Sequence, residues 1–126
     1  MHPAARPWFD KASEDRKNAS VLFEAGRFAG AVFFAHQTAE KSLKAVLVGV
    51  ERTKVHTHDI RSLAARLGVP KEIMECVSEL NPDYTVSRYP DAANGDPTEA
   101  YTERMTREHL DCADKVLEWA RSKLAS

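Results

Sequence analysis

The sequence lacks the features that mark membrane-spanning, secreted or strongly basic nucleic-acid-binding proteins. It holds no apolar run of roughly 18 residues, the length that a membrane helix needs. The first residues, MHPAARPWFDKASEDRK, are charged and contain no apolar signal-peptide core. The net charge is −1, so any RNA or DNA contact would need a local basic patch. We therefore expect a cytoplasmic protein that does not bind membranes.

Cysteine is also scarce. Cys76 and Cys112 lie far apart in the sequence and match no metal-ligand spacing. We expect two reduced thiols, no metal site and no cofactor. The 126 residues, 43% hydrophobic and 29% charged, have the balance of one globular domain spanning residues 1–126.

Apolar residues recur at spacings of three and four, and no alternating strand pattern competes with them. A first helix is predicted at about Pro7–Ala25 and a second at about Phe28–Gly49. Gly26 suits the left-handed position that ends the first helix.

The rest of the chain also reads as helix, apart from one long segment. Gly68 ends a third helix, and Pro70 opens a fourth that stops at Asn81, before a proline. Thr102 suits the N-cap of the last helix. Residues 81–101 between them read as irregular. The fold class predicted is all-α: an up-and-down antiparallel bundle of four to five helices, with a long irregular loop before the last helix.

The second helix is apolar on several sides, which leaves two interpretations: it is central in the bundle, or a second subunit covers it. We expect a homodimer, with Phe34 on the outer side. Four polar residues interrupt the apolar surface: His36, Gln37, Glu40 and Lys44. They indicate either a satisfied core histidine beside a solvated ion pair, or the polar lining of a cleft.

The irregular segment holds all three tyrosines of the chain, and these indicate that its ends are anchored. Such a loop is either a packed Ω-loop or functional. In the functional interpretation, Arg88 contacts a phosphate or acidic group and the rings of Tyr84 and Tyr89 face a base. We expect Arg88 to project toward His36, Gln37 and Glu40.

Four stretches carry a specific spelling in a fixed order: AGRFAGAVFFAHQTAEKSLKAVLV, THDIRSLAARLG, LNPDYTVSRYPDA and YTERMTREHLDCADKVLEWAR. Together they resemble the HEPN domain family (higher eukaryotes and prokaryotes nucleotide-binding). The resemblance implies a small helical bundle that often dimerises, and frequent pairing with a minimal nucleotidyltransferase in toxin–antitoxin systems. It also implies that several branches are metal-independent ribonucleases, while others are binding or accessory domains.

The ribonuclease branches of that family carry an arginine followed about four to six residues later by a histidine, one to neutralise phosphate and one to move a proton. Arg52–His58 and Arg104–His109 match this spacing, but a helix would turn the second pair about 140° apart. Arg52 and His58 lie in a link where they could converge. Arg88, in the expected region, has no such histidine after it.

The sequence therefore favours a nucleotide- or RNA-binding accessory module whose ligand-binding residues are Arg88, Tyr89, Tyr84, His36, Gln37, Glu40 and Lys44. The alternative is a metal-independent ribonuclease that uses Arg88 or Arg52 with His36 or His58.

Overall fold

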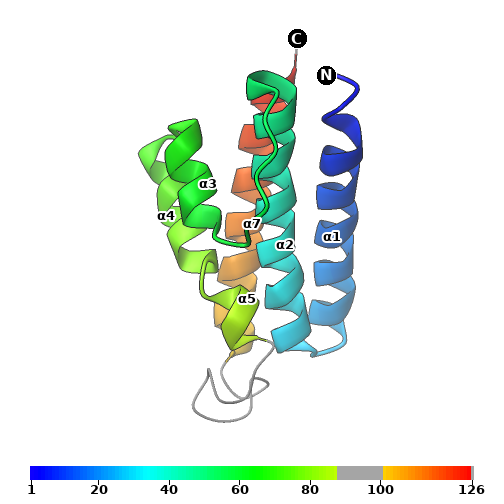
Figure 1. Cartoon of the computed structure of the whole chain (residues 1–126). Coiled ribbons are helices and arrows are strands. Elements are labelled where there is room, and N and C mark those ends of the chain that lie inside the picture. The colour runs from blue at the N-terminus through cyan, green and yellow to red at the C-terminus, as the bar shows by residue number, and fades with distance from the viewer. Residues whose placement is uncertain (88–100, 126) are drawn as a thin grey trace.

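The structure is a computed structural model that describes residues 1–87 and 101–125. Three long helices lie side by side: α1 (Arg6–Glu24), α2 (Phe28–Val46) and α7 (Glu103–Leu124). Two shorter helices, α3 (Ile60–Leu67) and α4 (Lys71–Leu80), form a pair that packs on α2 and α7 (Figure 1). The described residues contain no strand, and the all-α prediction is confirmed.

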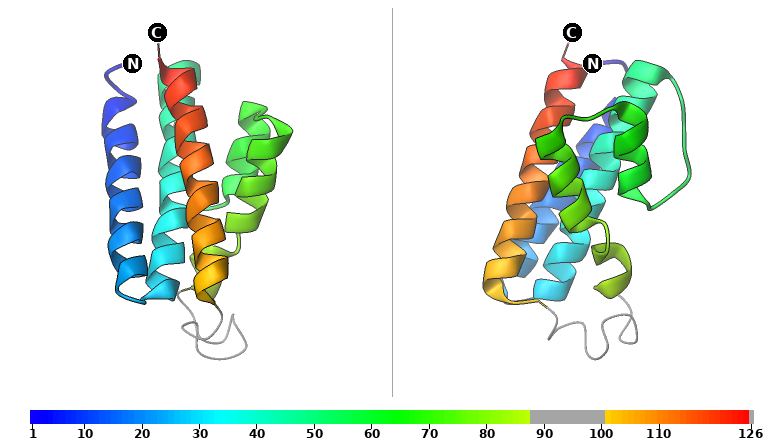
Figure 2. Two further views of the ribbon diagram at one scale, coloured as in Figure 1. Left: turned by 180° about the vertical axis from the view of Figure 1, so that it is seen from behind. Right: turned by 90° about the vertical axis from the view of Figure 1, so that its left-hand side faces the viewer.

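The helices alternate in direction except at one place. α1 and α2 are antiparallel, as are α3 and α4 and then α4 and α7, whereas α3 runs in the same direction as α2 (Figure 2). The exception arises because residues 52–59 carry the chain back along α2 before α3 begins. This extended link brings His58 beside the middle of α2, where the candidate site lies.

Helix α2 is central. It contacts α1, α3, α4, α5 and α7, and most of its residues are buried. Helices of the same chain therefore cover α2, and its apolar circumference needs no second subunit to explain it. The homodimer stays a prediction. The main apolar core lies between α2 and the helices around it, and is built from Ala35, Ala39, Leu43, Leu47, Leu63, Val77, Leu80, Val116 and others.

The end of α2 differs from the prediction. The α-helix ends at Val46, and residues Leu47–Glu51 form a π-helical turn. The wider turn shifts the helical register, and Val50 is 56% exposed. Gly49 faces the core instead, where an added Cβ would lie 2.6 Å from Leu124 and 2.9 Å from Ala5. Only a glycine allows this approach.

The predicted helix ends are confirmed where local chemistry sets them. Gly26 and Gly68 have φ of 74° and 64°, the left-handed conformation that glycine adopts without strain. The Thr102 hydroxyl accepts a hydrogen bond from the Met105 backbone N–H, as an N-cap should. Asp59 is the N-cap of α3, and its side chain accepts hydrogen bonds from the backbone N–H groups of Arg61 and Ser62.

Part of the segment predicted as irregular is helical. Asp83–Val86 forms the short helix α5, directly after the turn at Asn81 and Pro82. Four residues are too few to hold a helix by themselves, so tertiary contacts must stabilise it. Arg88 and Tyr89 lie outside the described residues, and so does the expectation that Arg88 points toward α2.

Candidate functional site

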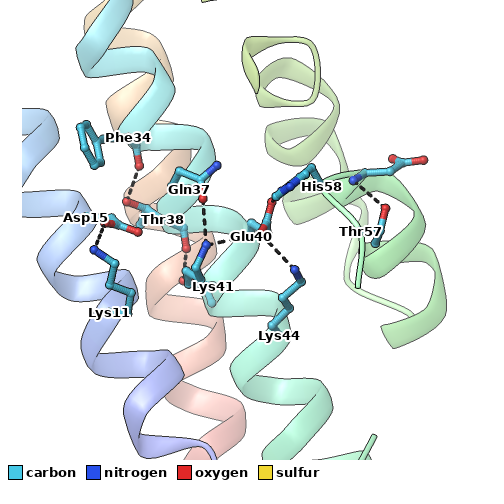
Figure 3. A network of polar contacts seen from close by, with 12 residues as sticks. Lys11, Asp15, Phe34, Gln37, Thr38, Glu40, Lys41, Lys44, Thr57 and His58 are labelled. Carbon is cyan, nitrogen blue, oxygen red and sulfur yellow. Dashed lines mark hydrogen bonds and ion pairs between the residues drawn. The ribbon is translucent and has the colours of Figure 1, made fainter. Parts of the chain in front are cut away.

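The polar residues of α2 converge on Glu40, whose side chain is only 1% exposed. One carboxylate oxygen lies 2.8 Å from Nδ1 of His58. The other accepts hydrogen bonds from Nζ of Lys44 at 3.0 Å and Nζ of Lys41 at 3.4 Å. Figure 3 shows His58 reaching Glu40 from the link while both lysines extend from α2 itself. A buried carboxylate thus has three partners.

Lys41 also ties Gln37 into this network, because its Nζ donates a 2.8 Å hydrogen bond to Oε1 of Gln37. Lys44 lies on the side of α1, with its ammonium 5.8 Å from the centre of the Trp8 ring. The predicted pairing of Glu40 with Lys44 is confirmed, but the pair is not solvated: the Lys44 side chain is 10% exposed.

The three partners keep Glu40 ionised. Burial acts to raise its pKa, but the hydrogen bond from His58 and the charges of Lys41 and Lys44 outweigh burial, so the pKa lies below its ordinary value. With two ammonium groups for one carboxylate, the network carries excess positive charge at neutral pH even when the imidazole is neutral.

The contact with Glu40 fixes the protonation of His58. An ionised carboxylate can only accept, so Nδ1 of His58 carries the hydrogen, and Nε2 of the neutral ring keeps its lone pair. The His58 side chain is 53% exposed, unlike that of Glu40. Neighbouring residues hold the backbone here, since Asp59 N–H donates to the Thr57 hydroxyl at 3.0 Å. The result is a carboxylate-oriented histidine that solvent can reach.

Tyr84 forms the aromatic side of the site. Its ring stacks on His58 with centroids 4.1 Å apart and planes 14° apart. It also lies 5.6 Å from the ring of His36 and 6.0 Å from that of Phe33, both on α2. α5, the short helix that the sequence did not predict, therefore brings the predicted ligand residue Tyr84 against His58, a catalytic candidate, and near His36.

His36 is fully buried, and neither of its ring nitrogens has a hydrogen-bond partner of good geometry. Burial lowers its pKa from 6.5 to about 4; the charge of Glu40 and the nearby backbone of His58 oppose that shift only in part. The interpretation as a satisfied core histidine is wrong for this reason. His36 is a neutral imidazole whose buried polar atoms are left unsatisfied.

A second carboxylate–histidine pair escaped the sequence analysis. Asp83, at the start of α5, is 2% exposed and accepts a 2.8 Å hydrogen bond from the Tyr101 hydroxyl and a 2.5 Å one from Nδ1 of His109. Glu79 lies 3.4 Å from the other ring nitrogen of His109. Tyr84 and Tyr101 are therefore both held against helices, which confirms that the ends of the predicted loop are anchored.

Between its two carboxylates His109 favours the charged form. Burial acts to lower its pKa, but Asp83 and Glu79 outweigh burial and raise it. The same burial raises the pKa of Asp83, against the hydrogen bonds that it accepts. Because the two groups share a short hydrogen bond, we take the pair as imidazolium and carboxylate.

Neither Arg–His match of the sequence forms a site. The Arg104 side chain is 89% exposed and pairs with Glu108, whereas His109 points into the core, as helical geometry predicted. The prediction that Arg52 and His58 could converge is wrong. Arg52 lies beyond the end of α2, by the chain termini, while His58 lies at Glu40, about 16 Å of helix rise away.

Residues 1–87 and 101–125 contain no group of three histidine, cysteine or acidic side chains placed to hold a metal ion. None of the helices in these ranges is long and apolar enough to cross a membrane. The site itself offers a carboxylate, two ammonium groups, an oriented imidazole and an aromatic face.

The bundle and its sequence match known proteins over nearly the whole chain. The HEPN domain model matches residues 5–123, so the chain belongs to the HEPN domain family. A protein of Methanocaldococcus jannaschii named "Putative toxin MJ1304" is 28% identical over 130 residues, covering 90% of this chain and 84% of the relative.

Solved structures agree. TT1696 from Thermus thermophilus superposes with a TM-score of 0.87 at 32% identity, covering 95% of this chain and 98% of its own. The archaeal HEPN homologue ST0689 superposes with a TM-score of 0.85 at 32% identity, covering 96% and 98%. A HEPN domain protein from Thermotoga maritima, 19% identical with a TM-score of 0.73 over 91% and 94%, shares the fold.

Proposed function

We propose that this HEPN protein has a toxin-like role and binds a nucleotide or RNA at the Glu40 network. The observation that carries the proposal is the excess of cations around a single buried carboxylate: Lys41 and Lys44 both reach Glu40. A phosphate can share these ammonium groups without displacing Glu40, because the network already carries net positive charge. Similarity to a protein named as a toxin supports the toxin-like part.

The aromatic residues favour a ligand with a base. Tyr84 and His58 already stack face to face, and a half-exposed His58 can give up its place to a nucleobase that stacks on the same ring. His36 beneath them offers a buried donor and acceptor that lack partners. Phosphate and base would then contact neighbouring parts of one site. Arg88 and Tyr89 remain proposed ligand residues on the strength of the sequence.

Binding to single-stranded RNA tests the proposal. Replacing Lys44→Gln removes one cation from the network and should weaken binding roughly tenfold, about 1.4 kcal/mol, with a shallower dependence on salt because one phosphate contact is lost. Lys71→Gln, an exposed lysine at the start of α4, is the matched control and should bind as the wild type does. Equal affinity of both variants, measured by fluorescence anisotropy, would exclude the Glu40 network as the binding site.

The second candidate function is a metal-independent ribonuclease, and the 2.8 Å contact between Glu40 and His58 favours it. A carboxylate that holds Nδ1–H leaves Nε2 as a base able to accept the proton of an RNA 2′-hydroxyl, and Lys44 could offset charge on the phosphate. Against it stands the missing histidine after Arg88. We expect no cleavage of labelled single-stranded RNA at neutral pH. Cleavage that disappears in His58→Ala but persists in His56→Ala would establish the ribonuclease.

The partners follow from family membership. We propose that the chain works in the cytoplasm as part of a toxin–antitoxin-like system with a minimal nucleotidyltransferase. Co-expression of this chain with a nucleotidyltransferase encoded beside it, followed by size-exclusion chromatography, tests the pairing; separate elution of the two proteins would reject it.

We also propose a homodimer. Light scattering at micromolar concentration should report about twice the chain mass of 14.1 kDa. Phe34, predicted on the outer side of the second helix, packs partly buried against the core. Its exposed part is the portion available to a second subunit, so Phe34→Glu should weaken the dimer while the helical circular-dichroism signal persists. A monomer mass for the wild type across the micromolar range would refute the assembly.

A further inference from the structure

The buried cluster of Asp83, Tyr101 and His109 takes no part in the proposed binding chemistry, yet its side chains are buried and joined by hydrogen bonds. Three described elements meet there: α4 through Glu79, α5 through Asp83 and α7 through His109. Tyr101, two residues before α7 begins, joins them. Asp83 of this cluster directly precedes Tyr84 in the sequence, so the cluster can affect where Tyr84 lies.

We propose that His109 is a positioning residue for the binding site: through Asp83 it fixes α5, and α5 holds Tyr84 against His58. The inference rests on the proposed function only in assigning Tyr84 and His58 to a ligand site. The positioning itself stands on the contacts among these residues.

Helix geometry links the two clusters. Successive residues of a helix point about 100° apart, so when Asp83 turns toward α7, Tyr84 turns toward α2 and the link. The structure shows both orientations: Asp83 contacts His109 on α7, and Tyr84 contacts His36 on α2 and His58 on the link. The side-chain contacts of Asp83 thereby set the direction in which the Tyr84 ring projects.

Within residues 1–87 and 101–125, the backbone hydrogen bonds of α5 are local. Its backbone closes only a single turn, with Val86 N–H bonded to Pro82 and Ser87 N–H bonded to Asp83. The Ser87 hydroxyl also donates to the Asp83 carbonyl. These contacts shape α5 without attaching it to the bundle. Attachment comes from the side chains of Asp83 and Tyr84 on its two sides.

The position of Tyr84 also affects the contact between His58 and Glu40. With Tyr84 stacked on one face, the His58 ring has one preferred plane, and in that plane Nδ1 lies 2.8 Å from Glu40. Loss of the stack would free the half-exposed His58 to rotate away. His109 would then affect the orientation of His58 without touching it, through Asp83 and Tyr84 in turn.

Nuclear magnetic resonance of ¹³C,¹⁵N-histidine-labelled full-length protein tests this. Stacked on Tyr84, the His58 ring protons should be shifted upfield, and its Nδ1 should show the protonated-nitrogen signature. His109→Leu removes the donor to Asp83 and should abolish both signals. His109→Asn, whose amide nitrogen occupies nearly the place of Nδ1, should restore them.

Val116→Ala is the control, because Val116 is buried in the same helix but lies outside the cluster. It should lower the melting temperature while leaving the His58 signals in place. The positioning role is overturned if His109→Leu keeps the His58 shifts, or if Val116→Ala loses them equally. Should His109→Leu fail to fold, Tyr101→Phe decides: it removes one of the hydrogen bonds to Asp83 and should reduce the upfield shift, and an unchanged shift overturns the role.

The same variants separate the positioning role from the proposed function. His109→Leu and Tyr84→Ala should weaken binding of single-stranded RNA by the same factor, since both remove the stacked ring from its position. If the wild type binds neither RNA nor a nucleotide, the proposed function fails, while the His58 signals still decide whether His109 positions the stack.

Discussion

Glu40 and Asp83 are both buried carboxylates that hold a histidine by Nδ1, yet their surroundings differ in charge. Glu40 receives two lysines in addition to His58, and its pKa is lowered despite burial. Asp83 receives a tyrosine hydroxyl and a single cation, and its pKa is raised. Burial acts to raise the pKa of both carboxylates, but Glu40 has more cations within reach and Asp83 also faces the like charge of Glu79, so Glu40 is held more firmly as an anion.

The histidines differ in the same way. His58 is half-exposed and keeps a ring nitrogen for a ligand, whereas His109 is enclosed between Asp83 and Glu79. In the roles proposed above, one motif, a carboxylate with an imidazole, serves binding where water reaches it and attachment where water does not. The predictions below test that division of roles.

The largest effect is expected from Asp83→Ala. It leaves the His109 imidazolium and the Tyr101 hydroxyl buried without their acceptor, and removing one partner of a buried pair costs about 3–5 kcal/mol. Urea unfolding monitored by circular dichroism should show this loss. Asp111→Ala, on the exposed side of the same region of α7, is the control and should change the free energy of unfolding little. A loss below about 1 kcal/mol at Asp83 would mean that the pair does not attach α5.

Acid should destabilise the protein through His36. Its pKa is 6.5 when unfolded and about 4 when folded, so between these values the unfolded chain binds a proton that the folded chain excludes. The free energy of unfolding should therefore fall as pH is lowered from 6.5 to 4, by about 3 kcal/mol from this group.

His36→Phe removes that titration. The variant should lose less stability than the wild type over the same pH range, measured by urea midpoints at each pH. Parallel curves for the two proteins would show that His36 is protonated in the folded state or has found a partner.

Glu40→Gln should cost less than Asp83→Ala, about 1–3 kcal/mol. The reason is that Lys41 and Lys44 are long side chains that can extend toward water once the carboxylate is gone, whereas His109 cannot. The same substitution should release His58 from its fixed tautomer, visible in its ¹⁵N shifts. A loss of stability as large as that of Asp83→Ala would show that the lysines cannot extend toward water, and the two sites would then not differ in this respect.

A smaller effect of opposite sign is expected from His109. Because its folded pKa is raised, its contribution is fully present below the unfolded value of 6.5 and is lost as pH rises through the folded pKa. Stability should thus decline gently above neutrality in the wild type but not in His109→Asn. Identical alkaline profiles in urea unfolding would contradict the imidazolium form.

The sequence predicted what local chemistry decides. Gly26 and Gly68 end helices because of their own backbone freedom, and Thr102 caps α7 with its own hydroxyl. Lys44 pairs with Glu40 because four residues make one turn. For the same reason, the polar face of α2 could be recognised from its spacing alone.

What the sequence did not predict depends on residues far apart in the chain. No feature of the sequence DYTV indicates a helix. α5 forms because of its contacts with α2 and α7. The Asp83–His109 pair spans 26 residues, and a tyrosine from the far end of the loop completes it. The helical spacing did show that Arg104 and His109 diverge. The direction that His109 then faces was the one feature of the sequence that could have indicated the missed cluster.

The buried polar side chains of α2, His36 and Glu40, have a consequence for the order of folding. The α1–α2 hairpin can form early from contacts close in sequence, but His36 and Glu40 would then still be hydrated. Their final dehydration must wait until His58 and Tyr84 arrive from the second half of the chain. The charged network is therefore a late step, closed only when both halves dock. Glu40→Gln should accelerate unfolding and leave the folding rate nearly unchanged, with a φ-value below about 0.3 in stopped-flow measurements.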